Sequence, residues 1–368
     1  MKRKQLFLGL SMLAYGLSSC QKSEVKSTET ATNRLKTVAT VSAEGTWTGF
    51  FKRNSNNGWS AGDATLSIPV THNHTTNITG NFWLFGDSHI NDISYNGSIY
   101  TRNCMYSVYN GMMYQNSNTA NVFTTLLGTG SGPAQTRIKF PENSGPLLYF
   151  PGVDTIRLWP GHGYEEGNFV YAFYSGHRNN MSYKQGYTYV ATMLYTGTGV
   201  SATTVTKLAS TKTSNGINWG MWCIASTTDN YVYIYGTKGG GYLGSSYLHV
   251  ARATKTNING AWDYWNGTTF QSNVNNSVSV CSGISNHASV VKFLNSSGQA
   301  RYAVINQEIP LGCGNGRNIN LYGISTALTG PFNFNKTLYT VVDKLPGHTG
   351  PSDPYMRTYD CQAHPQIG

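Results

Sequence analysis

Four stretches of the chain repeat one pattern, in which a bulky apolar and aromatic run ends in a polar residue or a glycine. They are Asn81–Asp87, Asn168–Gly176, Asn230–Thr237 and Arg301–Glu308. Turn residues separate the last three from further strand-like stretches at Tyr187–Tyr195, Tyr247–Ala253 and Asn318–Thr326. Aromatic and β-branched runs between turn signals indicate strands, and helical apolar spacing is almost absent. The pattern predicts an all-β fold of repeated antiparallel sheets.

These repeats lie about 60 to 90 residues apart, which is too far for a short solenoid repeat. Recurrent antiparallel sheets at this spacing are typical of the blades of a β-propeller. Four repeats, with strands before and after them, predict five blades, and a β-sandwich is the alternative fold. The chain stops at Gly368 soon after a further blade begins. Either N-terminal strands complete that blade or the propeller is truncated at its C-terminus, and the abrupt ending favours truncation.

The N-terminus predicts export. Three basic residues precede an apolar run from Leu6 to Leu17, and Ser18-Ser19-Cys20 follows. This order is the signature of a secretory signal, and the apolar run is too short to span a bilayer. Leu-Ser-Ser-Cys resembles the bacterial lipobox, which implies that Cys20 is acylated and anchors the protein. An ordinary signal with an incidental cysteine is the alternative.

We therefore predict a lipoprotein signal peptide over residues 1–20, a flexible tether over 21–45 and the propeller domain over 46–368. The tether is polar and lacks aromatic residues, so it cannot bury enough apolar surface to fold. The net charge is +10, but the basic residues are scattered and form no nucleic-acid motif. The expected location is the bacterial outer membrane or cell surface, with the membrane contacted only through the lipid.

Acidic residues are scarce, and Asp63 and Asp87 stand out among them. Asp63 precedes an apolar strand that contains Leu66 and Ile68, and Asp87 ends the run Phe-Trp-Leu-Phe-Gly-Asp. If the two strands form a hairpin, both carboxyl groups lie at the same end of the sheet. Glycoside hydrolysis needs two such carboxyl groups around one sugar bond. The alternative is that both aspartates cap turns beside glycine.

The segment Gly62–Pro69 (Gly-Asp-x-x-x-Ser-x-Pro), followed by Trp83–Ser88 (Trp-Leu-Phe-Gly-Asp-Ser), resembles a group of five-bladed propellers. That group includes bacterial endo-D-arabinanases and related domains, and it is similar to the arabinanase-like glycosidases. Further short matches extend the resemblance over residues 46–368. The resemblance implies that Asp63 and Asp87 are the catalytic carboxylates. His162 departs from the group, because an acid is expected there, and this histidine indicates either a proton carrier or lost activity.

Seven other residues are candidates for the site. Glu166 and Glu308 each adjoin a predicted inner strand and are candidates for a third acid, although a solvated turn glutamate is the alternative for both. Trp59 and Trp159 are candidates for stacking on a sugar ring, with a place in the core as the alternative. His162, Arg252 and His287 are candidates for substrate contacts near a central channel; an ordinary hydrogen-bonded histidine is the alternative for the two histidines.

The leading hypothesis is a glycoside hydrolase that degrades a furanose-containing, arabinan-like polysaccharide at the cell surface. Its expected partner is a polysaccharide or oligosaccharide, and it is expected to act as a monomer, without cofactor or catalytic metal. A structural calcium ion on the axis is left open. The alternatives are a glycan-binding surface lipoprotein without catalysis and a polysaccharide lyase, since propellers host many activities.

Overall fold

The computed structural model describes residues 45–53, 56–71, 80–98, 100–102, 107–116, 123–128, 138, 156–178, 183–196, 199–209, 215–239, 245–308, 316–333, 335–344, 355 and 359–367. All of them belong to one structural unit that spans residues 41–368. The predicted signal peptide, Cys20 and the predicted tether, apart from Gly45, lie outside the described residues. No helix within the ranges given above is long and apolar enough to cross a membrane.

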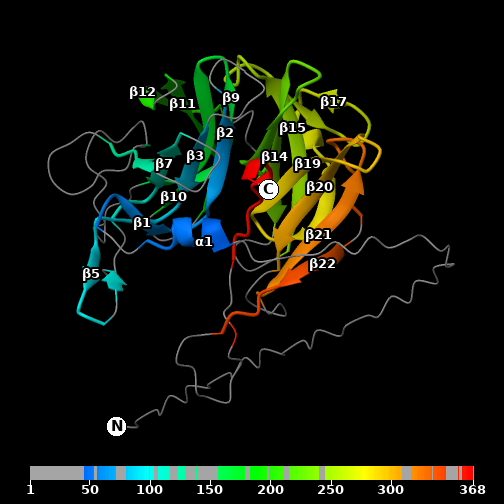
Figure 1. The fold of residues 1–368 in the computed structure, drawn as a ribbon. Coiled ribbons are helices and arrows are strands. Elements are labelled where there is room, and N and C mark those ends of the chain that lie inside the picture. Colours follow the sequence, from blue (N-terminus) through cyan, green and yellow to red (C-terminus); the bar gives the residue numbers. More distant parts are fainter. Residues whose placement is uncertain are drawn as a thin grey trace, which may run out of the picture. The chain divides into compact units, whose positions relative to one another are not determined.

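Four antiparallel sheets follow one another along the chain and form the blades of a β-propeller (Figure 1). The first blade contains β2 (Leu66–Val70), β3 (Gly80–Phe85), β7 (Gly111–Gln115) and β8 (Phe123–Thr125). The second contains β9 (Ile156–Glu166), β10 (Phe169–Arg178), β11 (Tyr183–Tyr195) and β12 (Val200–Lys207). The all-β propeller predicted from the sequence is confirmed, with four blades among the described residues.

The third and fourth blades complete this series. The third contains β13 (Asn218–Ala225), β14 (Tyr231–Gly239), β15 (Ser246–Thr254), β16 (Trp262–Trp265) and β17 (Phe270–Gln271), and β18 (Ser279–Ile284) also pairs with β15. The short 3-10 helix η1 (Val274–Asn276) precedes β18. The fourth blade contains β19 (Ala288–Leu294), β20 (Ala300–Gln307), β21 (Asn318–Ser325) and β22 (Asn335–Thr340).

The first strand of each blade is the innermost one. Strand β9 contacts both β2 and β13, and β13 contacts β19, so these strands lie side by side. The four repeated segments of the sequence correspond to the second strands β3, β10, β14 and β20. These strands read as nearly continuous apolar runs because blades pack on both of their faces, as in β14, where Val232 to Thr237 are all buried.

The innermost strands of the second and third blades approach each other so closely that only glycine fits. A Cβ atom on Gly161 would lie 2.1 Å from the carbonyl oxygen of Gly220. Gly220 itself has a φ of +91°, which glycine adopts without strain. This contact explains the Trp-Pro-Gly sequence within β9 and fixes the position of Trp159, two residues earlier.

A small satellite packs on the first blade. It comprises α1 (Gly45–Phe51), the two-stranded sheet of β1 (Trp59–Gly62) and β4 (Ser88–Ile90), and the hairpin of β5 (Ile93–Tyr95) and β6 (Tyr100–Arg102). Phe50, Trp59, Trp83 and Phe85 form its apolar cluster. Strand β1 precedes β2 in the chain and β4 follows β3, so the β1–β4 sheet adjoins the end of the first blade.

The segment 359–367, which ends in the 3-10 helix η2 (Pro365–Ile367), lies between the fourth blade and the first (Figure 1). Ser289, on β19, donates to Gln362 at 3.0 Å and accepts from the Ala363 amide at 2.9 Å. Ser67, on β2, is 2.7 Å from Nδ1 of His364 and accepts from Gln366 at 2.6 Å. The segment thus bridges β19 and β2, the innermost strands of the fourth and first blades. These two strands do not pair with each other.

Candidate active site

Asp63 and Asp87 lie together at one end of the first blade, as the predicted hairpin requires. Strands β2 and β3 are antiparallel with Leu66 opposite Leu84, and the pairing continues beyond them. The Asp63 amide donates to the Asp87 carbonyl at 3.2 Å, and the Gly86 amide donates to the Asp63 carbonyl at 2.8 Å. The two aspartates therefore mark the junction between the β2–β3 hairpin and the small β1–β4 sheet.

The carboxyl group of Asp87 is buried, with 6% of the residue exposed. Its Oδ1 accepts a hydrogen bond of 3.2 Å from Nε1 of Trp159 on β9. Burial raises its pKa to about 6, while the Trp159 hydrogen bond and the charge of Arg157 oppose the increase and the charge of Asp63 adds to it. Because burial disfavours the charged form, Asp87 holds its proton at a pH at which an exposed aspartate has lost it.

Asp63 lies in a less buried environment, with a different set of partners. Burial also raises its pKa, but Tyr359 donates a hydrogen bond to its carboxylate, which opposes the increase. The charge of Asp360 raises this pKa further and that of His89 lowers it. The charge of Asp63 raises the pKa of Asp87, so the two carboxyl groups lie close enough to interact.

The second blade contributes an aromatic wall next to this pair. The ring of Trp159, near the start of β9, packs against that of His177, near the end of β10, at a tilt of 34° with ring centroids 4.4 Å apart. His177 also contacts the Ser175 hydroxyl through Nε2 at 2.9 Å. Burial lowers the pKa of His177 to about 4, and the charge of His287 acts in the same direction. His177 is therefore neutral near pH 7.

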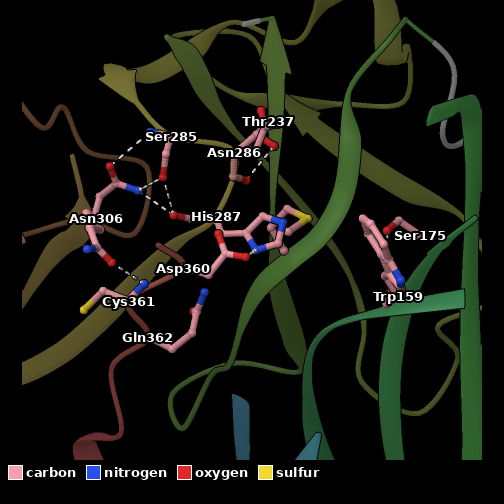
Figure 2. A network of polar contacts seen from close by, with 12 residues as sticks. Trp159, Ser175, Thr237, Ser285, Asn286, His287, Asn306, Asp360, Cys361 and Gln362 are labelled. Carbon is pink, nitrogen blue, oxygen red and sulfur yellow. Dashed lines mark hydrogen bonds and ion pairs between the residues drawn. The ribbon is translucent and has the colours of Figure 1, made fainter. Parts of the chain in front are cut away.

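The fourth blade and the segment 359–367 contribute an ion pair. Nδ1 of His287, just before β19, is 3.1 Å from Oδ2 of Asp360, and Figure 2 shows the two side chains facing each other. Burial alone would lower the pKa of His287, but the charge and the hydrogen bond of Asp360 raise it. Figure 2 shows Trp159 and Ser175 on the side of the view opposite Asn306.

The structure separates the two glutamates that the sequence suggested as a third acid. Glu308 follows β20, at the end of the fourth blade where His287 also lies, and its amide donates to the Asn318 carbonyl at 2.7 Å. Glu166 is at the far end of β9, 3.8 Å from Nζ of Lys255. Glu166 lies seven steps along the strand from Trp159, which is about 23 Å. Glu166 is thus not brought to the aspartates.

Three predicted substrate contacts occupy other positions. Trp59 is 3% exposed and stacks on Phe85 in the satellite, so its ring has no face for a sugar. His162 is buried between β2 and β13: its Nε2 contacts the Ser67 carbonyl at 3.0 Å, and its Nδ1 lies 3.4 Å from the Cys223 amide. Burial lowers its pKa to about 3. His162 is therefore a neutral, structural histidine.

Arg252 lies on β15, the third strand of its blade, and faces Asp263 on β16 with the nearest charged atoms 3.4 Å apart. The rings of Tyr231 and Phe270 lie 4.2 and 4.5 Å from its guanidinium carbon. These partners hold Arg252 on the surface of the third blade. The structure brings Asp63, Asp87, Trp159 and His287 to one end of the blades, together with Glu308.

Two members of the site, Tyr359 and Asp360, were not predicted. They precede Cys-Gln-Ala-His-Pro in the sequence and follow no strand pattern. One property of a propeller could have located them in advance: the segment that closes the ring must lie beside the first blade, and hence beside Asp63. Within the described part of the chain, no group of three or more His, Cys, Asp or Glu side chains is arranged to hold a metal ion.

Sequence comparison places the chain in a family. The family described as a domain of unknown function, DUF5005, matches residues 44–368. The chain belongs to this family. No curated protein matches the sequence significantly.

Solved structures resemble this DUF5005 domain in fold. A candidate hydrolase from Bacteroides ovatus ATCC 8483 has a TM-score of 0.61 and 18% identity, over 88% of this chain and 80% of that one. A GH43_1 enzyme from Xanthomonas citri complexed with xylotriose has a TM-score of 0.40 and 13% identity, over 79% of each chain. An endo-arabinase from Bacteroides thetaiotaomicron VPI-5482 has a TM-score of 0.40 and 11% identity, over 78% and 85% of the two chains.

Proposed function

We propose that this DUF5005 protein is a glycoside hydrolase that cleaves a polysaccharide with Asp63 and Asp87 as its carboxyl pair. The observation that carries the proposal is the placement of two interacting carboxyl groups at one hairpin end in unequal environments. Hydrolysis of a glycosidic bond requires two carboxyl groups with different protonation states. The resemblance of Gly62–Pro69 and Trp83–Ser88 to arabinanase-like propellers supports a furanose-containing, arabinan-like substrate.

The unequal environments also assign the roles. Asp87 is the general acid: its pKa of about 6 keeps the proton available for the leaving oxygen. Asp63 acts in its ionised form, either as a base that activates water or as the nucleophile. When the glycosidic bond breaks, the Asp87 proton moves to the leaving oxygen and the bond electrons stay with that oxygen. As a base, Asp63 accepts a proton from water while the water oxygen bonds to the anomeric carbon. As a nucleophile, its carboxylate bonds to that carbon, and water then hydrolyses the ester while Asp87 takes back a proton.

The site contains groups suited to holding a sugar beside this pair. Trp159 presents an indole ring that is fixed by His177 on one side and by Asp87 at Nε1. Aromatic rings bind the C–H faces of sugars. Because Trp159 contacts the general acid directly, a sugar stacked on it would lie next to the proton to be transferred.

We further propose that the protein is an exported lipoprotein, anchored through Cys20 at the outer membrane or cell surface, and that it is a monomer. The basic start, the apolar run and the Leu-Ser-Ser-Cys sequence support this location. Metabolic labelling with a palmitate analogue, lost in Cys20→Ala, tests the anchor, and light scattering tests the oligomeric state.

We also propose a fifth blade, with the segment 359–367 in the place of its innermost strand. The hydrogen bonds of this segment to Ser289 and Ser67, at equivalent places on β19 and β2, support this position. An experimental structure would test it, because a fifth sheet built around this segment is expected.

The activity is tested by release of reducing ends from a glycan panel of arabinans, arabinogalactans and acidic polysaccharides. Wild type is compared with Asp63→Asn and Asp87→Asn, and Asp263→Asn on the third blade is the matched control. We expect release by wild type and by the control, and loss in both site variants. An aryl glycoside of the released sugar, whose leaving group needs no proton, should restore cleavage by Asp87→Asn but not by Asp63→Asn.

Three other outcomes contradict this assignment. Unsaturated, ultraviolet-absorbing products would indicate a lyase. Retention of a glycan without cleavage, unaffected by both substitutions, would indicate a binding protein. Cleavage that survives in both variants, with folding verified by circular dichroism, would place the catalytic groups elsewhere.

A further inference from the structure

We propose that Tyr359 and Asp360 complete the active site as positioning residues: Tyr359 holds the carboxyl group of Asp63, and Asp360 holds the ring of His287, which binds a hydroxyl group of a neutral sugar. This inference rests on the proposed function. It adds the segment 359–367 as a further part of the site, and it adds His287 as a substrate contact.

Tyr359 acts on Asp63 directly. Its hydroxyl donates a hydrogen bond to the Asp63 carboxylate, which favours the charged form and fixes its orientation. The charged groups that act on Asp63 are Asp360, which raises its pKa, and His89, which lowers it. The phenol of Tyr359 is the neutral donor that opposes the effect of Asp360. A base or nucleophile needs both the charge and the orientation that this contact provides.

Asp360 acts through His287. The ion pair between Nδ1 and Oδ2, at 3.1 Å, places the Nδ1 proton between them and directs Nε2 away from Asp360. The same arrangement, in which a carboxylate orients a histidine, is common where the second ring nitrogen contacts a ligand. Asp360 raises the pKa of His287, and the charge of His287 in turn lowers the pKa of His177.

The charges around the site favour a hydroxyl group as the ligand of His287. Three carboxyl groups, Asp63, Asp87 and Asp360, gather here, and an anionic sugar would be repelled by them. A hydroxyl group both donates and accepts, so it suits a histidine in either protonation state. The inference therefore specifies a neutral glycan.

The backbone directly after Tyr359 and Asp360 is fixed by contacts to the fourth blade. Asp360 has a φ of +56°, in the left-handed region that is uncommon for residues other than glycine. The next amide, of Cys361, donates to Gln307 on β20 at 3.2 Å, and Gln362 is bonded to Ser289. An unusual conformation held by neighbouring contacts is a feature of functional sites.

The first test uses Tyr359→Phe, with Tyr247→Phe as the control, because Tyr247 is a similarly exposed tyrosine on β15. Carbon-13 NMR measures the pKa of Asp63 in each protein, without any glycan. We expect this pKa to rise in Tyr359→Phe only, and the acidic limb of the kcat/KM profile to move to higher pH with it. An unchanged Asp63 pKa, or an equal change in the control, overturns the role of Tyr359.

The second test uses Asp360→Asn, with Asp263→Asn as the control. Nitrogen-15 NMR of the imidazole should show a lower His287 pKa in Asp360→Asn. Binding is measured with the inactive Asp87→Asn background and the panel glycan that this protein retains best, with linear arabinan tried first. Loss of one charged hydrogen bond predicts binding weaker by roughly tenfold or more.

These outcomes separate the inference from the proposed function. Weaker glycan binding in Asp360→Asn, with no cleavage by wild type, would support the role of His287 and remove the hydrolase assignment. Cleavage by wild type with binding and kcat/KM unaltered in Asp360→Asn would overturn the role of Asp360 and His287 and leave the aspartate pair intact. Failure of the Asp87→Asn protein to bind any glycan of the panel also overturns that role.

Discussion

The burial of Asp87 predicts that this residue destabilises the folded protein at neutral pH. Folding raises its pKa from 3.8 to about 6, mainly through burial of the charge. Because each pKa unit corresponds to 1.36 kcal/mol, the charged carboxylate costs the fold about 3 kcal/mol. The sign follows from proton binding: between these two pKa values the folded state holds more protons than the unfolded state. Stability from this residue therefore decreases as pH rises from about 4 to 6, and stays low above that.

Asp87→Asn removes this cost. The amide is neutral at every pH and keeps an oxygen that can accept from Nε1 of Trp159. At pH 7.5 we expect the variant to be more stable than wild type by up to about 3 kcal/mol, and near pH 3.5 the difference should almost disappear. For a domain of this size, about 3 kcal/mol corresponds to an increase in Tm of roughly 4 °C.

Thermal unfolding followed by circular dichroism at both pH values measures this difference, with Asp263→Asn as the control because Asp263 is half-exposed and ion-paired. The control should show no gain at pH 7.5. A stability difference between Asp87→Asn and wild type that is the same at pH 3.5 and 7.5 would refute the reasoning, since it would mean that the charge of Asp87 carries no folding cost. A more stable and inactive variant would show that the fold tolerates this cost for catalysis.

Three further predictions concern single residues. Trp159→Phe removes the donor that lowers the pKa of Asp87, so the alkaline limb of the kcat/KM profile, expected near pH 6 in wild type, should move to higher pH. His162→Ala leaves buried partners unsatisfied and should lower the free energy of unfolding by about 3 kcal/mol at pH 8 in urea titrations. At pH 5 the loss should be smaller by roughly 2 kcal/mol, because unfolded wild type binds a proton at this histidine while the folded protein, with a His162 pKa of about 3, does not. Glu166→Gln should retain wild-type activity in the reducing-end assay, because Glu166 pairs with Lys255 away from the aspartates; a loss above about tenfold would contradict this placement.

Much of the propeller was predictable from local sequence. The four apolar segments correspond to second strands, whose burial on both faces produces long aromatic and β-branched runs that are easy to recognise. The proximity of Asp63 and Asp87 was also predictable, because a hairpin brings the start of one strand to the end of its neighbour. Both inferences depend only on residues close together in the chain.

The parts that sequence reasoning placed differently depend on contacts between blades. Trp59 and His162 look like site residues in sequence, yet packing against Phe85 and between β2 and β13 buries them. Asp360 follows no strand pattern in the sequence, yet ring closure brings it to His287. No local pattern reports which blade a side chain meets, so such positions follow only from the assembled ring.

The segment 359–367 also has a consequence for the order in which the protein matures. Ser67 and His364 are 297 positions apart and in contact, so this contact cannot form until all four blades have been synthesised. The blades themselves depend on short-range hairpins, which form faster than contacts of such high sequence separation. A nascent chain can therefore bury most of its core while Asp63 still lacks Tyr359. Catalytic activity is therefore expected to appear only at the last stage of folding, after the four blades have formed.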